Sequence, residues 1–358
     1  MRLVQKRPTW HPPDMNTVML ILLSGFIGTV AALAPIACTL EGQASRAFRE
    51  ACNQGDVAGK PAITSRPSCG PRADSESHLA AARTLMVQFQ RLNPMVVQQT
   101  NPDVLITDYS WDGGGGRELS RQDVNKLRWR LPQRPRIVLA YVSVGEAEDY
   151  RYYWTQAAGG GSASFLDRPN PKWPGNVRVR FWDPAWHRVL YSGRDSWIDR
   201  IVDAGFDGVF LDTVDAAESW AEDGRRDAPD QMNRLIASLA AHARKKVPGF
   251  LVIASNPFVL LERTPVADAL SGIVAEDHLL KGDTLRPPEA IEAILTPLRR
   301  AAREGLTILA VEYPGSRPGR ERFASLCSQE GFLCYSGVRA LDRPGTMVPL
   351  QTQSEVWP

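Results

Sequence analysis

Short apolar runs recur along most of this 358-residue chain and alternate with stretches of helical periodicity. The helical stretches, such as Arg194–Ala204, Gln231–Lys246 and Pro288–Glu304, each have one apolar face. Alternation of strand and helix favours a parallel sheet, and eight such units over about 260 residues are typical of a (β/α)8 barrel. The eight candidate strands are Leu85–Phe89, Val104–Thr107, Ile137–Val142, Val177–Trp182, Gly208–Leu211, Phe250–Ala254, Gly272–Ala275 and Thr307–Val311.

A ninth apolar run, Gly331–Tyr335, leaves the strand count open. Either it is a strand added after the barrel closes, or one of the eight runs is not a barrel strand. An open, doubly wound sheet is the alternative architecture, but no Gly-x-Gly-x-x-Gly sequence follows the first candidate strand. We therefore predict a single α/β domain, a (β/α)8 TIM barrel over residues 78–345, with a C-terminal tail over residues 346–358.

The N-terminal segment has the features of a targeting sequence. Basic residues precede an uncharged, mostly apolar run, Val18–Ala37, which resembles a secretory signal and at 20 residues is long enough to span a bilayer. Cys38 follows this run in an imperfect lipobox. We predict a signal peptide or membrane anchor over residues 1–38 and a flexible linker over residues 39–77. The protein is expected outside the cytoplasm, held to a membrane only through this segment or a lipidated Cys38.

The cysteines support export. Apart from Cys38, the four cysteines fall into two local pairs, and an even number in an exported chain suggests the disulfides Cys52–Cys69 and Cys327–Cys334. Free thiols are the alternative. The five histidines are scattered without zinc-site spacing, so we predict no metal and no cofactor. A net charge of +2 without a clustered basic patch gives no indication of a nucleic-acid partner.

Polar and aromatic residues follow nearly every candidate strand, and six of these strand ends carry acids. Because the carboxyl ends of parallel strands meet on one face of a barrel, we expect these side chains to lie together, where barrel enzymes place their chemistry. Capping of the next helix accounts for one such acid, but it accounts poorly for six. Charges gathered on one face need water, each other or a ligand.

Asp212 and Glu276 each follow a buried apolar run. Residues two apart share a face of a strand, so if these acids point into the barrel, Phe210 and Val274 do as well. One strand separates the two runs, which places the carboxyl groups roughly 5–9 Å apart. That range covers both retaining and inverting glycosidases and chooses neither. The alternative is that Asp212 or Thr213 only caps the next helix.

Six motifs follow one another in a specific order: Asp103–Ser110, Ala140–Trp154, Trp173–Trp186, Ala204–Asp215, Gly272–Asp277 and Val311–Tyr313. Together they resemble glycoside hydrolase family 114, the endo-α-1,4-polygalactosaminidase-like group, over roughly Thr84 to Pro344. The resemblance implies a barrel that acts on an α-1,4-linked, galactosamine-rich polysaccharide, with Asp212 and Glu276 as the catalytic acids. Departures from the family at Leu85–Gln90 and Ala254–Asn256, which would line the sugar groove, leave the exact substrate open.

We therefore expect hydrolysis of a glycosidic bond by two carboxylates. Glu276 would protonate the leaving oxygen, its pKa raised by neighbouring acids, and Asp212 would act as nucleophile or would position water. A carboxylate-lined cleft suits the cationic amine of a deacetylated amino sugar. The candidate substrate-binding residues are Asp108, Tyr109, Tyr141, Ser143, Glu146, Trp182, Asp183, Asp215, Asn256, Glu312 and Tyr313.

A purely structural role is open to several of these residues. Asp183 precedes Pro184 as a helix cap does, which is the favoured interpretation, and capping suits Asp215 equally well. Core packing suits Trp182 as well as sugar stacking does. An exported polysaccharide-binding barrel without turnover is the alternative function, because it would use the same side chains. A metal-dependent deacetylase lacks the histidines it would need.

Overall fold

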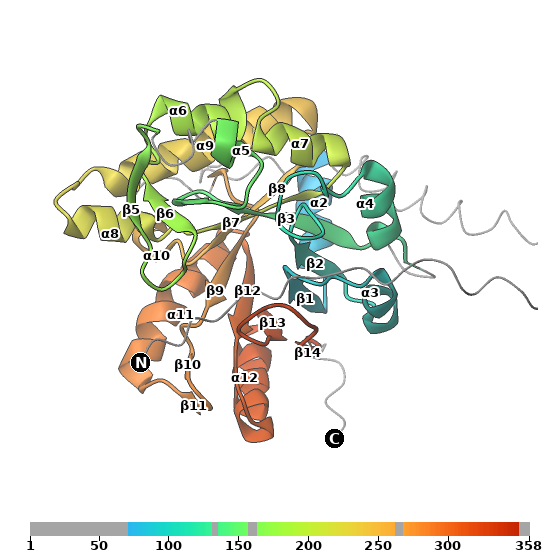
Figure 1. Cartoon of the computed structure of the whole chain (residues 1–358). Coiled ribbons are helices and arrows are strands. Elements are labelled where there is room, and N and C mark those ends of the chain that lie inside the picture. The colour runs from blue at the N-terminus through green and yellow to red at the C-terminus, as the bar shows by residue number, and fades with distance from the viewer. Residues whose placement is uncertain (1–70, 131–134, 157–162, 262–267, 351–358) are drawn as a thin grey trace, which may run out of the picture. The chain divides into compact units, whose positions relative to one another are not determined.

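The computed structural model describes residues 71–130, 135–156, 163–261 and 268–350 (Figure 1). One curved sheet lies at its centre, in which eight strands run parallel and the last is antiparallel to its neighbour. The signal or anchor segment, most of the predicted linker and the last eight residues lie outside the described residues. In sheet order the strands are β1 (Leu85–Gln88), β2 (Val104–Thr107), β3 (Ile137–Ser143), β7 (Gly208–Asp212), β8 (Leu251–Ser255), β9 (Gly272–Glu276), β12 (Thr307–Glu312), β13 (Leu333–Ser336) and β14 (Thr346–Val348).

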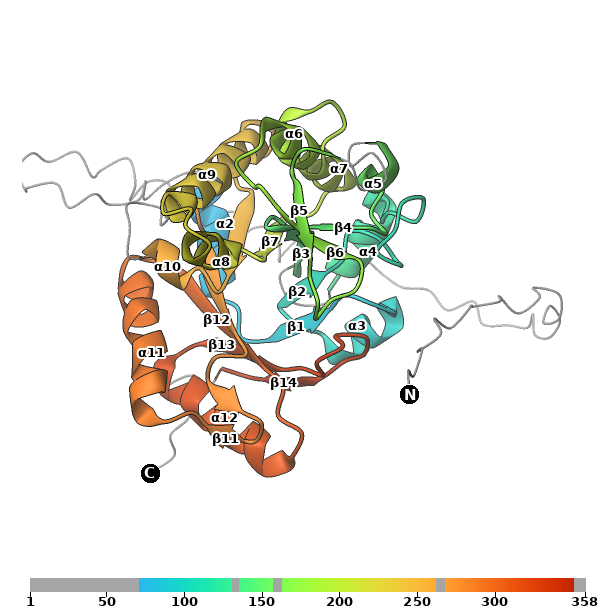
Figure 2. The same cartoon turned by 60° about the vertical axis from the view of Figure 1, so that its left-hand side comes forward.

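The sheet curls into a nearly closed barrel (Figure 2). The chain on either side of β14 joins its two edges, because Leu350 N donates to Arg83 O at 3.0 Å and Phe89 N donates to Leu341 O at 2.9 Å. Phe89, Tyr141 and Phe210 meet inside, with ring centroids 4.8–6.3 Å apart. The (β/α)8 architecture expected from the sequence is therefore confirmed.

Most helices lie around the outside of the strands, and the longer ones pack one apolar face inward (Figures 1 and 2). In α7, for example, Trp197, Ile198, Ile201 and Val202 are buried, and Gly205 ends the helix at a φ of 85°. The helices are α2 (Pro71–Ala80), α3 (Pro94–Thr100), α4 (Arg121–Arg128), α5 (Tyr153–Gln156), α6 (Pro184–His187), η1 (Arg188–Ser192), α7 (Trp197–Ala204), α8 (Ala216–Glu222), α9 (Ala228–Lys246), α10 (Phe258–Leu261), α11 (Pro288–Arg303) and α12 (Arg317–Glu330).

The prediction that Val177–Trp182 is a barrel strand is wrong. This run overlaps β6 (Asn176–Val179), the middle strand of a separate antiparallel sheet with β4 (Glu146–Glu148) and β5 (Leu166–Pro169). Its Val-Arg-Val-Arg alternation differs from the continuous apolar run of a parallel strand that is buried on both faces, and Arg178 is buried here in ion pairs with Asp167 and Asp223. The eighth parallel strand is β13, which overlaps the ninth apolar run, and all four of its residues are buried.

Two predicted boundaries also need correction. The linker was expected to extend through residue 77, but α2 begins at Pro71, and Arg72 Nη2 donates to Leu270 O at 3.3 Å. Leu79 is the fully buried apolar anchor of this polar helix, which is why its sequence resembles a linker. The tail was expected from residue 346, but β14 occupies residues 346–348, where it pairs with β13 and covers an otherwise open sheet edge.

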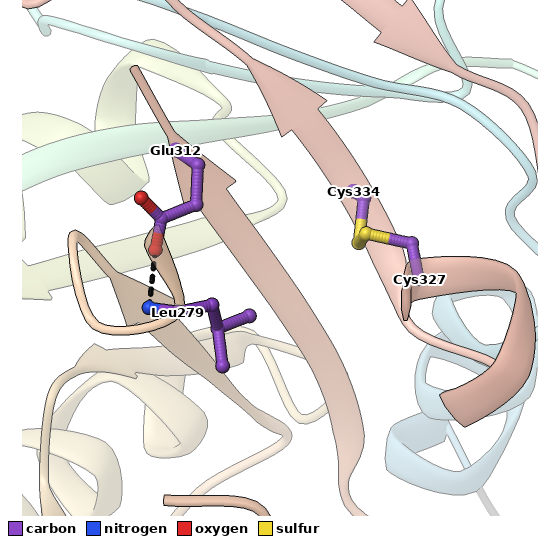
Figure 3. The surroundings of a disulfide bond; sticks show 4 residues. All are labelled: Leu279, Glu312, Cys327 and Cys334. Atoms are coloured by element: carbon purple, nitrogen blue, oxygen red, sulfur yellow. Dashed lines mark hydrogen bonds between the residues drawn. A yellow bond between two sulfur atoms is a disulfide. The ribbon is translucent and has the colours of Figure 1, made fainter. Parts of the chain in front are cut away.

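A small hairpin and a disulfide complete the described part of the chain. β10 (Leu280–Lys281) and β11 (Thr284–Leu285) pair after β9. Cys327 of α12 and Cys334 of β13 form a disulfide with Cα atoms 6.2 Å apart, so this predicted pair is confirmed (Figure 3). Cys52 and Cys69 lie outside the described residues. Within those residues no helix has both the length and the apolar composition needed to cross a membrane.

Replacing both Cys327 and Cys334 by alanine is expected to lower the free energy of unfolding by about 2 kcal/mol, because the unfolded chain regains the freedom that the crosslink removes. Urea denaturation of the oxidised protein and of the variant measures this difference. Reduced wild-type protein serves as the control and should unfold with the variant. Identical midpoints for the oxidised protein and the variant would show that the bond contributes nothing.

Candidate active site

Asp212 and Glu276 are the last residues of β7 and β9, which lie on either side of β8. Both side chains are partly exposed. Burial, followed by the charge of Glu276, raises the pKa of Asp212 to about 8. The two carboxyl groups therefore act on each other at the carboxyl end of the barrel, and they hold a proton near neutral pH.

The surroundings of the two acids differ. Burial raises the pKa of Glu276, but two hydroxyl groups oppose this effect. Tyr313, directly after β12, donates its hydroxyl proton to Glu276 Oε1, and Ser255 Oγ donates to Oε2 at 3.4 Å. Because donors to a carboxylate stabilise its ionised form, they favour a charged Glu276, with the proton of the pair on Asp212.

The backbone after each of the three strands β7, β8 and β9 is in the left-handed region. Thr213, Asn256 and Asp277 have φ values of 58°, 49° and 60°. Such values are uncommon outside glycine, above all for β-branched threonine. The Thr213 hydroxyl holds its strained residue in place by accepting from Gly145 N at 2.8 Å and bonding Ser143 Oγ at 2.9 Å. Backbone strain of this kind is typical of functional sites.

Asn256 binds the backbone of Glu276. Its Oδ1 accepts from Glu276 N at 2.9 Å, and its Nδ2 donates to Glu276 O at 3.3 Å. Both polar ends of the amide, predicted to bind substrate, are thus engaged within the protein. Ser143, also predicted to bind substrate, is similarly engaged, since it donates to Glu146 O at 2.8 Å. These two side chains orient the strand ends that carry the acids.

A buried ion-pair network lies beside Asp212. Arg151 Nη1 is 2.8 Å from Asp108 Oδ2, and Arg151 Nε is 2.7 Å from Glu148 Oε2. Burial raises the pKa of Asp108 to about 6, against the opposing charge of Arg151. The Tyr141 hydroxyl donates to Glu148 Oε1 at 3.3 Å and also hydrogen-bonds Asp212, so it connects the network to the acid pair.

The sequence prediction contained Asp108 and Tyr141 but missed the partners that hold them. Glu148 and Arg151 stand three residues apart within the motif Ala140–Trp154, and this closeness of opposite charges in the chain is the available signal. Nothing in the sequence places Asp108 against them, because that contact spans 43 residues.

Two other predicted residues lie near the acids. Tyr313 contacts Glu276 directly, and the Arg339 guanidinium lies 4.6 Å from the centre of its ring. Asp215 is exposed at the start of α8, which it does not cap through its side chain. Arg339 also pairs with Asp277 through two contacts of 2.8 and 2.9 Å. The sequence analysis missed Arg339 because this residue follows β13, which was not among the eight candidate strands.

The remaining predicted residues have partners elsewhere. Tyr109 is buried against Trp197, with centroids 5.7 Å apart. Asp183 caps α6 by accepting from Ala185 N at 2.7 Å, as the favoured interpretation expected. These further contacts complete the set: Trp182 packs on Trp220 at 4.7 Å, Glu146 accepts from Asn170 and Asn176 at 2.7 and 2.9 Å, and Glu312 accepts from Leu279 N at 2.5 Å (Figure 3).

Glu312 is almost fully buried, and its backbone donors do not offset the cost of burial, so its pKa rises to about 7. Glu312 accepts from the backbone N–H groups of Leu279 and Leu280, and these bonds hold the loop that follows β9, the strand that ends in Glu276. Within the residues described, no group of three or more His, Cys, Asp or Glu side chains is placed to hold a metal ion.

The residues 97–348 match the glycoside-hydrolase family GH114. The chain belongs to this family. It is 30% identical over 252 residues to an uncharacterised protein of Thermotoga maritima, covering 69% of this chain and 75% of that protein. It is 31% identical over 232 residues to one of Methanocaldococcus jannaschii, covering 63% and 65%. The fold resembles the glycoside hydrolase domain of PelA from Pseudomonas aeruginosa, with a TM-score of 0.58 and 19% identity over 76% of this chain and 100% of that domain. This GH114 protein is therefore a glycoside hydrolase.

Substitution of Arg151 by alanine should destabilise this GH114 protein by about 3–5 kcal/mol, because Asp108 and Glu148 lose the cation that compensates their burial. The control is Arg117→Ala, which removes an exposed arginine 3.8 Å from Asp112 and should cost less than about 0.5 kcal/mol. Urea denaturation of both variants tests the contrast, and equal losses would contradict the network's role.

Substitution of Asp212 by asparagine should stabilise the protein at alkaline pH. Because folding raises the pKa of Asp212 from 3.8 to about 8, the stability that its neutral form contributes is complete below about pH 4 and is lost as the pH rises through 8. The unfolding free energy of the variant relative to wild type should therefore rise between pH 4 and 8 by at least about 1.4 kcal/mol, the equivalent of one pKa unit. A difference that stays constant with pH would mean that Asp212 has an ordinary pKa.

Proposed function

We propose that this GH114 protein cleaves α-1,4-linked, galactosamine-containing polysaccharide, with Asp212 and Glu276 as the catalytic carboxylates. The observation that carries this proposal is the pair itself. Both acids are partly exposed, one strand lies between the strands that carry them, and the charge of Glu276 raises the pKa of Asp212. Hydrolysis of a glycosidic bond by two carboxyl groups needs one protonated and one ionised member. In the free protein near neutral pH, the raised pKa of Asp212 keeps one carboxyl group protonated while the other is ionised.

The charges around the pair support a cationic sugar as the substrate. Asp215 is exposed beyond Asp212, and Glu146 is partly exposed between its two asparagine partners. The nearby cations do not cancel this charge, because Arg151 is shared between two acids and Arg339 is paired with Asp277. A surface of negative charge attracts the ammonium group of deacetylated galactosamine.

The proton position in the free protein bears on the role of each acid. The mechanism expected from the sequence has Glu276 as general acid, whereas the hydroxyl groups of Tyr313 and Ser255 favour its ionised form. In the proposed reaction, the bound sugar displaces water from the pair, and the carboxyl group facing the glycosidic oxygen donates the proton. The other carboxylate attacks the anomeric carbon or activates water.

Aryl galactosaminides separate the two roles, because an aryl leaving group needs little protonation. The alanine variant of the general acid should keep most of its activity on such substrates while losing it on the polymer. The alanine variant of the other carboxylate should lose both activities. With the implied roles, Glu276→Ala is the variant that keeps aryl activity; the opposite result would exchange the roles of Glu276 and Asp212 and leave the pair intact.

The substitutions Asp212→Asn and Glu276→Gln test the pair directly. Each should lower the release of reducing ends from a partially deacetylated α-1,4-galactosamine polymer by about 10²–10⁴, the usual contribution of an acid–base group. Asp203→Asn, a control at an exposed acid of α7, should stay within about twofold of wild type. If both test variants stay within about tenfold of wild type, the assignment is wrong. Binding of the polymer by the wild type without any release of reducing ends would favour the non-catalytic alternative.

We also propose that the protein acts outside the cytoplasm. The disulfide Cys327–Cys334 supports this location, because such bonds persist in oxidising compartments. The apolar run Val18–Ala37, outside the described residues, supplies a candidate export signal in the sequence.

A further inference from the structure

Two exposed aromatic side chains lie on the small sheet β4–β6–β5. Trp173, in the turn between β5 and β6, is 59% exposed, and Tyr150, just after β4, is 45% exposed. In the pairing of β4 with β6, Glu148 is opposite Asn176, and Asp149 N donates to Gly175 O at 2.9 Å. Tyr150 is the next residue after Asp149, and Trp173 precedes Gly175 by two residues, so this backbone bond brings the two segments that carry the aromatic side chains together.

The turn that presents Trp173 is held firmly. Asn170 N donates to Asn176 O at 2.8 Å, and Asn176 N donates to Trp173 O at 3.0 Å. The side chains of both asparagines donate to Glu146, at 2.7 and 2.9 Å. The backbone that carries Trp173 is therefore held in place, while its side chain contributes little to the core and presents an exposed face to a ligand.

Tyr150 is also fixed, and its contacts lead back to the acid pair. Its hydroxyl donates to Glu148 Oε1 at 2.5 Å, and its ring contacts Gly113, where an added Cβ would lie 3.2 Å from Tyr150 Cε2. Glu148 accepts from Tyr141, which in turn hydrogen-bonds Asp212. Tyr150 is thus connected to the candidate active site through side chains in direct contact, and the segment of Trp173 is joined to that of Tyr150 through the backbone bond between Asp149 and Gly175.

We propose that Trp173 and Tyr150 form a distal subsite that stacks on a sugar unit of the polymer several units away from the bond that is cleaved. The proposal deepens the proposed function and rests on it for the identity of the ligand. The apolar C–H face of a pyranose fits an exposed aromatic ring, and an ammonium substituent adds attraction to the ring face. Asp149, which is exposed between the two aromatic residues and the turn, matches the charge of that amine.

The test compares Trp173→Ala with Trp129→Ala. Trp129 is 64% exposed, but it follows the C-terminus of α4 and precedes β3, so it lies at the opposite, amino end of the barrel. On a partially deacetylated α-1,4-galactosamine polymer, Trp173→Ala should lower kcat/KM by about tenfold, mainly through a higher KM, while Trp129→Ala stays within about twofold of wild type. On the shortest oligosaccharide that is cleaved, Trp173→Ala should also stay within about twofold. Trp173→Tyr should restore most of the loss on the polymer.

Affinity electrophoresis of the same variants in gels containing the polymer separates this proposal from the proposed function. If the wild type is retarded but cleaves nothing, and Trp173→Ala is retarded less, the subsite stands although the enzymatic function fails. If the wild type cleaves the polymer and Trp173→Ala matches it in retardation and kcat/KM, the subsite is overturned and the function stands. Equal losses on polymer and oligosaccharide, or a change in oligomeric state of Trp173→Ala by light scattering, would also overturn it.

Discussion

The structure depends on the interaction between two carboxyl groups held together with limited access to water. Like charges at such a position repel each other and lose hydration, so one member of the pair is held neutral near physiological pH. This arrangement lowers stability, and the surrounding fold offsets the loss. Asn256 fixes the backbone of Glu276, Tyr313 and Ser255 donate to its carboxylate, and Thr213 accepts a strained conformation behind Asp212. Such a balance is expected where activity, rather than stability, determines the residues.

The second feature is the way the chain builds outward from the barrel at β3. Gly145 turns the chain against Thr213, where an added Cβ would lie 2.2 Å from Thr213 O, and β4 then leads to the network of Glu148, Arg151 and Asp108. The same segment anchors the turn of the small sheet through Glu146. The segment from Gly145 to Arg151 therefore contacts the chain that carries the acid pair, and it also holds the small sheet, which adds surface for a polymer.

Much of the barrel could be predicted from the sequence because its parallel strands are buried on both faces. Runs such as Gly208–Asp212 are continuously apolar until a polar residue ends them, and that signal is local. The misassigned run shows the limit. Val177–Trp182 has the apolar residues of a barrel strand, but it also contains Arg178 and Arg180. The run instead pairs in the antiparallel small sheet, where ion pairs with Asp167 and Asp223 allow Arg178 to be buried. The polar helix α2 resembled a linker for the converse reason, since one leucine provides its fully buried contact.

The sequence predicted which strand ends carry the candidate site residues, but it did not predict which groups those side chains contact. The positions of Asp212 and Glu276 at strand ends could be predicted, because a buried apolar run that ends in an acid is a local signal, and the family resemblance singled out these two acids. Whether Asp183 or Glu312 faces a ligand or a backbone amide depends on contacts with α6 and with the loop after β9, which no local pattern encodes. Arg151 illustrates the same limit, because its partner Asp108 follows β2 and lies far from Arg151 in the sequence.

The central claim is that the charge of Glu276 raises the pKa of Asp212. It is tested most directly by following the side-chain carboxyl ¹³C shift of Asp212 from pH 3 to 10, in wild type and in Glu276→Gln. The account predicts a pKa near 8 in wild type and a fall of about one unit or more in the variant, because the neighbouring charge is removed while burial remains. An Asp212 pKa near 4 in wild type, or one that does not move in the variant, would contradict it.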